Sequence, residues 1–447
     1  MNRQQRRAQD KQSRRSREAA HLDLLPRAIQ HHREGRLAEA ESIYRHVLAA
    51  APAQADACHF LGVLLHQKGR SSEAVGLIRR AIEASPTYTD AYNNLGNVYF
   101  ETGDLDQAIA MYRKVIEFAP EFPDPYNNLA IALKDKDRLD EALEHARRAV
   151  ELAPERADYY HTLGNVHRKR GEFHLSAEAC RKSISLKPYQ ADAYKTLWRT
   201  FYIAQEFEEA GKVLDEWLAI DPGNAIARHT QASFKGGALV PDRASDDYVQ
   251  QTFDSFAASF DKVLERLEYR APALVTDAVI AEYDGGCRDL VVLDAGCGTG
   301  LCGPLIRDYA ARLVGVDLSP KMLARAASRE VYDELAEAEL VAFLQSRPGA
   351  FDLIVSADVL VYFGDLEPFA RAAADSLRPG GRLIFTVERS ASDLSYQLNI
   401  HGRYSHGQTY VRKVLEAAGL KLTSLQDEAL RKERGEPVQG MLVSARR

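Results

Sequence analysis

The sequence predicts two parts built on different principles, an α-helical repeat array followed by an α/β domain. Two observations predict the array: prolines recur every 34 residues, and small residues recur at the same interval. A third observation predicts the second part. From about residue 246, short apolar strands alternate with helical stretches, and the first strand runs into a glycine-rich turn.

The repeat array is defined by proline and small-residue markers. A proline stops a helix because its ring removes a backbone donor, and a small residue lets two helices approach closely. No hairpin buries its apolar face alone, so neighbouring hairpins stack into a solenoid. The markers resemble those of the tetratricopeptide family, with six repeats over 21–224. They are Pro52, Pro86, Pro120, Pro154, Pro188 and Pro222, with Ala40, Ala74, Ala108, Ala142, Ser176 and Ala210.

Amide side chains gather on the first helix of several hairpins, the helix expected to line the inner face of the solenoid. An amide donates and accepts hydrogen bonds at once, so a column of them suits a peptide backbone. The pattern resembles the asparagine ladder of O-linked sugar transferases and implies a protein or peptide partner, although Ile131 interrupts it. The alternative interpretation is that these asparagines are solvated or cap helices. The proposed peptide groove comprises Asn93, Asn94, Asn97, Asn127, Asn128 and Asn165.

Two shorter segments flank the repeats. Residues 1–20 form a basic tail that we expect to be disordered, since residues 1–17 hold seven basic residues against Asp10 alone. The tail is interpreted as solubilising, with contact to anionic lipid, ribosome or RNA as the alternative. Residues 225–245 are predicted to form a capping helix, near Asn224–Phe234, and a linker.

Composition excludes several classes of protein. The net charge of -6 argues against a nucleic-acid binder that depends on bulk positive charge. No stretch approaches about 18 apolar residues, and the basic start has no apolar region, so we expect neither a membrane span nor a secretory signal. The five cysteines form no C-x-x-C pair. We therefore expect no disulfide framework, no metal site and a cytoplasmic location.

The second part begins with a strand that ends in Asp294-Ala-Gly296-Cys297-Gly298-Thr-Gly300. Such a turn lets a ligand approach the backbone closely. A second acid, Asp317, closes the next strand and can accept both hydroxyls of a ribose. A nicotinamide dinucleotide competes for this interpretation, but the spacing is G-x-G-x-G and Asp294 would repel a pyrophosphate.

Two later blocks complete the pattern. The strand Phe351–Ser356 leads to Asp358, and Leu377-Arg-Pro-Gly380-Gly381 precedes another strand. In this order the three blocks resemble the class I S-adenosylmethionine-dependent methyltransferases over 246–447. The resemblance implies a Rossmann-like domain with a mostly parallel sheet, and the last two strands suggest a C-terminal antiparallel hairpin.

The resemblance also implies S-adenosyl-L-methionine as cofactor. Asp294 and the glycine turn would hold its methionine part, Asp317 its ribose and Leu318 and Met322 its adenine. Glu339 would face the adenine amino group, with a solvated surface acid as the alternative. The complete set of cofactor residues is Asp294, Gly296, Cys297, Gly298, Gly300, Asp317, Leu318, Met322, Glu339, Leu340 and Asp358.

Two further segments resemble parts of an acceptor site. The run Tyr248–Asp261 is similar to the N-terminal helical cap of small-molecule members of this family. Arg270 follows it, and it either holds a substrate carboxylate or makes a surface ion pair.

The candidate catalytic residues combine one acid with a polar cluster after the fifth strand. Histidine titrates near neutral pH, so it suits proton transfer, although each of these side chains also has a structural interpretation. The family's Asn-Pro-Pro-Tyr signature is absent, which lowers the odds of adenine or glutamine methylation. The candidates are Asp358, His401, Tyr404 and His406.

The leading functional hypothesis is a methyltransferase that acts on a protein or peptide recruited by the repeats, because tethering raises the effective concentration of an acceptor. The second is a small-molecule methyltransferase whose repeats serve assembly or localisation, which the cap resemblance favours. A non-catalytic scaffold is a third.

Overall fold

The computed structural model describes residues 24–257, 259–283, 288–391, 393, 395–433 and 435–447. The expected basic tail, residues 1–20, lies outside the described residues. The chain divides into two compact units, Met1–Ala210 and Gly211–Arg447, which are treated separately below.

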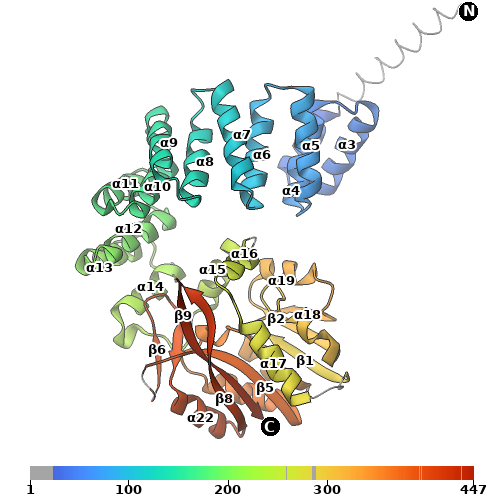
Figure 1. The fold of residues 1–447 in the computed structure, drawn as a ribbon, viewed down its shortest axis with the longest axis vertical. Coiled ribbons are helices and arrows are strands. Elements are labelled where there is room, and N and C mark those ends of the chain that lie inside the picture. The colour runs from blue at the N-terminus through green and yellow to red at the C-terminus, as the bar shows by residue number, and fades with distance from the viewer. Residues whose placement is uncertain (1–23, 258, 284–287, 392, 394, 434) are drawn as a thin grey trace, which may run out of the picture. The chain divides into compact units, whose positions relative to one another are not determined.

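The first unit is a stack of helical hairpins, which confirms the predicted solenoid (Figure 1). Consecutive helices contact each other within a hairpin, and first helices also contact those of the neighbouring hairpins. The hairpins are α2 (Leu25–Arg33) with α3 (Leu37–Ala50), α4 (Ala55–Gln67) with α5 (Ser71–Ala84), α6 (Thr89–Glu101) with α7 (Leu105–Phe118), α8 (Pro123–Asp135) with α9 (Leu139–Leu152), and α10 (Ala157–Lys169) with α11 (Phe173–Leu186). Then come α12 (Ala191–Ile203) and α13 (Phe207–Ile220), the latter running into the second unit.

Small residues set the distance between the helices of a hairpin. The repeated alanines and Ser176 are fully buried. A Cβ on Gly96 would lie 2.6 Å from the Tyr112 ring, and one on Gly164 would lie 2.7 Å from the Cys180 sulfur. A larger residue at either glycine would therefore push the paired helices apart.

The turns inside the hairpins need a left-handed backbone. Gly69, Gly103 and Gly171 supply it with φ between 78° and 83°. In two hairpins a residue with a side chain takes the same conformation, Asp137 at 62° and Gln205 at 63°. The repeat geometry thus imposes the turn even where the sequence lacks the residue that adopts it most easily.

The predicted capping helix is α14 (Ala225–Lys235), and it belongs to the second unit. The Asn224 side chain caps it by accepting a hydrogen bond from the Ala227 amide at 2.9 Å. His229 is buried, stacks on Tyr248 with ring centroids 3.9 Å apart, and bonds to the Gly402 carbonyl oxygen at 2.8 Å. This helix therefore packs on the α/β domain. The short helix η1 (Gly237–Leu239) follows it.

The second unit is built on one twisted sheet in the order β3-β2-β1-β4-β5, all parallel (Figure 1). Beyond β5 come β9 and β8, paired antiparallel, which confirms the predicted C-terminal hairpin. A small β6–β7 hairpin extends the end of β5. The strands are β1 (Leu290–Ala295), β2 (Ala310–Asp317), β3 (Glu334–Glu337), β4 (Phe351–Ser356), β5 (Leu377–Arg389), β6 (Tyr396–Leu398), β7 (Tyr404–His406), β8 (Lys421–Glu433) and β9 (Glu436–Arg446).

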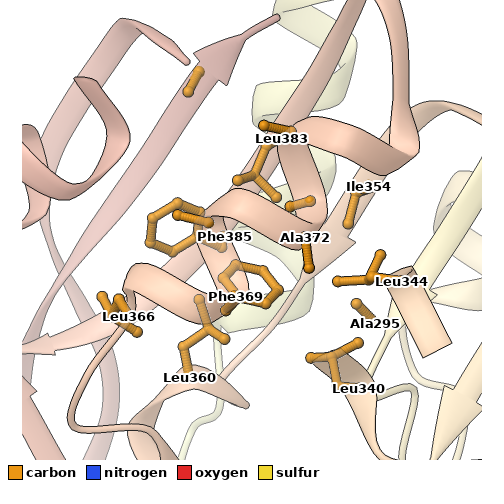
Figure 2. Close-up of a cluster of buried hydrophobic side chains, with 14 of the residues drawn as sticks. Ala295, Leu340, Leu344, Ile354, Leu360, Leu366, Phe369, Ala372, Leu383 and Phe385 are labelled. Atoms are coloured by element: carbon orange, nitrogen blue, oxygen red, sulfur yellow. The ribbon is translucent and has the colours of Figure 1, made fainter. Parts of the chain in front are cut away.

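Helices cover both faces of this sheet. One apolar cluster joins the sheet to α20 (Leu340–Gln345), α21 (Glu367–Ser376) and α22 (Gln408–Ala417), and another joins it to α17 (Ala271–Tyr283) and α18 (Gly303–Ile306). In the first cluster Phe369 meets Phe385 edge to face, with Leu340 and Leu344 beside them (Figure 2). Helix α19 (Pro320–Ala327) contacts β2 and β3. The remaining short helices are η2 (Arg307–Tyr309) and η3 (Leu360–Tyr362).

We predict that Phe369→Ala destabilises the second unit by about 3–5 kcal/mol, because it removes a fully buried ring and leaves a cavity. Denaturant unfolding of the full chain, followed by circular dichroism, measures the shift of the transition that belongs to this unit. Leu305→Ala is the matched control, since Leu305 is 45% exposed and should cost little. Equal effects of the two changes would contradict this description of the core.

Candidate functional site

A cavity of about 270 Å³ opens at the carboxyl ends of β1, β2 and β4. The chain leaves β1 toward β2 on one side and returns as β4 on the other, so the cavity lies at the topological switch point of the sheet. Ligands of open α/β sheets bind at this position.

The glycine-rich turn after β1 forms the floor of the cavity. Gly296, Gly298 and Gly300 all have positive φ, at 76°, 53° and 81°. A Cβ on Gly298 would meet no atom within 4 Å, so its backbone faces open space. Gly296, Cys297 and Gly298 line the cavity, whereas Gly300 packs against Tyr332 beneath it.

Two buried carboxylates flank this turn, and within the described residues neither forms an ion pair with a cation. The Asp294 carboxylate accepts a hydrogen bond from the Tyr332 hydroxyl at 2.6 Å, and burial raises its pKa to about 7. The Asp317 carboxylate accepts bonds from the Gly298 and Ser319 amides, at 2.8 Å and 2.9 Å. Burial raises the pKa of Asp317, while these amides oppose the rise. Both acids line the cavity.

Glu339 has a structural task besides its place in the cavity wall. It is the N-cap of α20, where its carboxylate accepts from the Val341 amide at 3.0 Å and the Ala342 amide at 2.8 Å. These bonds fix the carboxylate at the edge of the cavity. The predicted apolar neighbours Leu318, Met322 and Leu340 line the same wall.

The predicted cap comprises α15 (Asp246–Phe256) and α16 (Phe260–Arg266), and its phenyl rings line one side of the cavity. Phe253, Phe256 and Phe260 contact one another and line the cavity. This apolar cover keeps water away from whatever binds beneath it.

Two aspartates of the cap, which we call the latch, bond to residues in the loops that follow β1 and β2. Ser319 donates a hydrogen bond to Asp254 at 2.5 Å, and Thr299 donates one to Asp261 at 2.5 Å. Arg329 forms an ion pair with Asp261 at 2.7 Å. The latch thus joins the cap to both the glycine turn and the segment after β2.

A buried ionic network forms the opposite wall, beside β4. Asp358 has a left-handed backbone, with φ of 60°. One carboxylate oxygen accepts from Arg431 at 2.6 Å, and the other is buried without a hydrogen-bond partner in the described structure. Arg431 also pairs with Glu388 and Glu433, and Arg403 pairs with the same two acids. Burial raises the pKa of Asp358, and Arg431 opposes the rise.

The structure corrects two of the four candidate catalytic residues. Tyr404 is fully buried, and its hydroxyl donates to the Pro241 carbonyl oxygen at 2.7 Å. His406 is also fully buried, bonds to the Gly364 carbonyl oxygen at 3.2 Å and stacks on Tyr410. Burial lowers the pKa of His406 to about 4. Neither side chain lines the cavity, because β7 turns both into the protein interior.

The other two candidates differ in position. Asp358 lines the cavity. His401 is not among the lining residues; its ring lies 3.7 Å from the Glu388 carboxylate, and burial lowers its pKa. Arg270 is also absent from the wall, since it faces Glu428 at 3.6 Å and donates to the Ala429 carbonyl oxygen. In the structure Arg270 thus makes a surface ion pair.

Sequence patterns did not identify several residues of the site. Tyr332 carries no motif, and its contact with Asp294 spans 38 residues of chain. Arg431 lies in the charged run Arg431-Lys432-Glu433, which suggests a solvated strand, yet it is 4% exposed. Asp254 and Asp261 belong to the cap segment, but nothing in the sequence assigns them a partner.

The amides of the predicted peptide groove bond mainly to neighbouring inner helices. The Asn94 side chain bonds to His59 at 2.8 Å, and Asn128 donates to Asn93 and Asn97 at 3.4 Å and 3.5 Å. Asn127 is 8% exposed, so the prediction that it contacts a partner is wrong: its side chain is packed inside the stack. The remaining amides, Asn165 included, are partly exposed.

Two searches of the described residues were negative. No group of three His, Cys, Asp or Glu side chains there is arranged to hold a metal ion. No helix in the described part of the chain has the length and apolar character to cross a membrane.

Comparison with known proteins gives matches in both parts of the chain. A family described as "Methyltransferase domain" matches residues 293–385. Families described as tetratricopeptide or TPR repeat match residues 27–89, 77–110, 96–137 and 127–193. The crystal structure titled "Crystal structure of MamA" is 26% identical with a TM-score of 0.34, covering 36% of this chain and 95% of that one.

Two curated relatives match the second part. The human "Methyltransferase-like protein 27" is 31% identical over 182 residues, which are 40% of this chain and 72% of that protein. The "Ubiquinone biosynthesis O-methyltransferase" of Ralstonia nicotianae is 30% identical over 165 residues, 33% of this chain and 68% of that protein. With the switch-point cavity and the helical repeats, these matches show that the chain belongs to the S-adenosylmethionine-dependent methyltransferases of class I and carries tetratricopeptide repeats before its catalytic domain.

Proposed function

We propose that the switch-point cavity holds S-adenosylmethionine on the residues that its resemblance to the family assigns. The fit rests on the two buried acids, neither of which pairs with a cation of the described residues: Asp294 suits the ammonium of the ligand, and Asp317 suits hydroxyl donors. Asp294 and the open backbone at Gly298 would hold the methionine part. Asp317 would accept from the ribose hydroxyls, and Met322 and Glu339 would border the adenine.

The bound cofactor supplies an electrophilic methyl group on sulfur. The protein's own contribution is to align an acceptor and to exclude water. The phenyl rings of the cap exclude water from this side of the cavity. The latch, Asp254 and Asp261, holds the cap against the loops that follow β1 and β2.

For the acceptor, the geometry best supports a small molecule with a hydroxyl group. The observation that carries this is the wall formed by Phe253, Phe256, Phe260 and Tyr362, which suits a flat apolar molecule. Asp358 lies in the same cavity and is the proposed base, because one of its oxygens has no donor. As the O–CH3 bond formed and the S–CH3 bond of the cofactor broke, Asp358 would take the proton of the acceptor hydroxyl. One of the matched relatives is named as an O-methyltransferase, which supports a hydroxyl group as the acceptor.

A protein or peptide acceptor recruited by the repeats is the second candidate. Six hairpins form a large inner-helix surface, and its last part carries unpaired positive charge. Tethering a partner there would raise the concentration of an acceptor near the catalytic domain.

Transfer of a labelled methyl group from S-adenosylmethionine into cell extract separates the two candidates. We expect label in the small-molecule fraction with the native chain and none with Asp317→Ala. Label confined to macromolecules would contradict the small-molecule proposal and support the second candidate.

Binding of S-adenosylmethionine should strengthen as pH rises from 5 to 7, by up to about tenfold per pH unit. The reason is that Asp294, with a pKa of about 7, must lose its proton to hold an ammonium group, which stays charged over this range. Isothermal calorimetry measures the affinity. Asp294→Asn should bind weakly with little pH dependence, whereas the exposed Asp308→Asn should behave as the native chain. An unchanged pH profile in Asp294→Asn would refute this assignment.

Asp358→Asn should slow methyl transfer by about 10²–10⁴-fold, because it removes the proposed base. The affinity for S-adenosylmethionine should change by no more than about threefold. The assay uses the small-molecule fraction of extract as acceptor, with the exposed Asp375→Asn as control. Transfer at the native rate would exclude Asp358 as the base.

A further inference from the structure

The inner-helix surface near the end of the first unit carries positive charge that no acidic side chain of the described residues neutralises. We use the name cationic patch for Arg168 on α10 together with Lys195 and Arg199 on α12. Within the described part of the chain, none of the three forms an ion pair. Several other arginines of this unit are paired, for example Arg70 with Glu41 and Glu73, Arg138 with Glu141, and Arg170 with Asp140 and Glu172.

The three cations share one surface. Lys195 and Arg199 are four residues apart and so lie on the same side of α12. Helices α10 and α12 are in contact. Burial lowers the pKa of Arg168, and the nearby positive charge of Arg199 lowers it further. Lys195 and Arg199 also stand 34 residues after His161 and Asn165. The uncharged column of the earlier repeats thus becomes basic in the last repeat.

Arg168 is held in place by a chain of polar contacts. Its guanidinium donates to the Asn165 amide oxygen at 3.2 Å, the Asn165 side chain bonds to the His161 ring at 2.9 Å, and that ring bonds to the Thr196 hydroxyl at 3.0 Å. The Arg168 Nε atom is buried and has no acceptor in the described structure. These contacts fix the position of the Arg168 guanidinium, whose charge no acid of the described residues pairs.

We infer that the cationic patch binds an acidic, extended segment of a partner protein. Carboxylates complement the three unpaired cations, and the partly exposed amides of the preceding inner helices suit the backbone of the same segment. Nucleic acid is the less favoured occupant, because the amides beside the patch match both the donors and the acceptors of a peptide backbone, whereas a phosphate backbone offers only acceptors. The inference deepens the second candidate function, recruitment by the repeats, and rests on it.

Fluorescence anisotropy with the full chain tests this binding without any methyl transfer. The probe is a labelled peptide of about ten residues in which Glu and Gly alternate, compared with matched Gln–Gly and Lys–Gly peptides. We expect only the Glu peptide to bind, and salt to weaken its binding. A short RNA of mixed sequence serves as a second polyanion and should bind more weakly.

The first variant is Lys195→Gln with Arg199→Gln, because both side chains are exposed and their loss should not disturb packing. We expect affinity for the Glu peptide to fall by about tenfold or more. The matched control is Arg147→Gln with Lys182→Gln, which removes the same charge from exposed positions on the outer helices α9 and α11. Arg168→Gln should weaken binding further, with circular dichroism to confirm that the variant is folded.

Three results would overturn the inference: no binding of the Glu peptide, equal loss in the control variant, or stronger binding of RNA than of the peptide. Loss of self-association in Lys195→Gln/Arg199→Gln, measured by sedimentation, would assign the patch to a second copy and would also overturn it. Since the readout is binding, failure here differs from failure of methyl transfer, which the labelled-extract experiment measures.

Discussion

The organisation of the catalytic domain depends on the burial of two carboxylates at the switch point of the sheet. Asp294 and Asp317 end adjacent parallel strands, and they are held by a tyrosine hydroxyl and by backbone amides. No cation of the described residues compensates them. Buried acids in this state are unfavourable as ions, so this side of the cavity suits a ligand that carries positive charge.

In the wall beside β4 the buried acids are, by contrast, paired with cations. There three acids and two arginines are paired with each other, and Arg431 is the centre of the network. Such a network fixes the position of Asp358 rather than attracting a charged ligand. The left-handed backbone of Asp358 fits the same interpretation, because a strained residue persists only where the surroundings hold it. On one side of the cavity the buried carboxylates therefore have no paired cation, and on the other side the buried charges are paired with each other.

The two parts of the chain differed in how far the sequence predicted them. The hairpins follow from a 34-residue period, because each repeat packs only on its neighbours and the markers act locally. The glycine turn, Asp294, Asp317 and the aromatic cap were also predictable, since they lie in short contiguous motifs. Tyr404 and His406 were predicted wrongly as catalytic because polar clustering in sequence says nothing about which way a strand turns its side chains. Asn127 was misplaced for a similar reason, as helical periodicity leaves its exposure undetermined.

The sequence by itself determined the repeat architecture, the α/β domain and the family, because these depend on periodicity and on motifs with fixed spacing. Only the tertiary structure decided which charges are paired. Arg431 and Asp358 are separated by 73 residues and Tyr332 and Asp294 by 38, and no local pattern encodes such contacts. The same is true of the cationic patch. Whether its basic side chains are neutralised depends on which acids lie near them in space. The order of residues in the chain does not determine that distance.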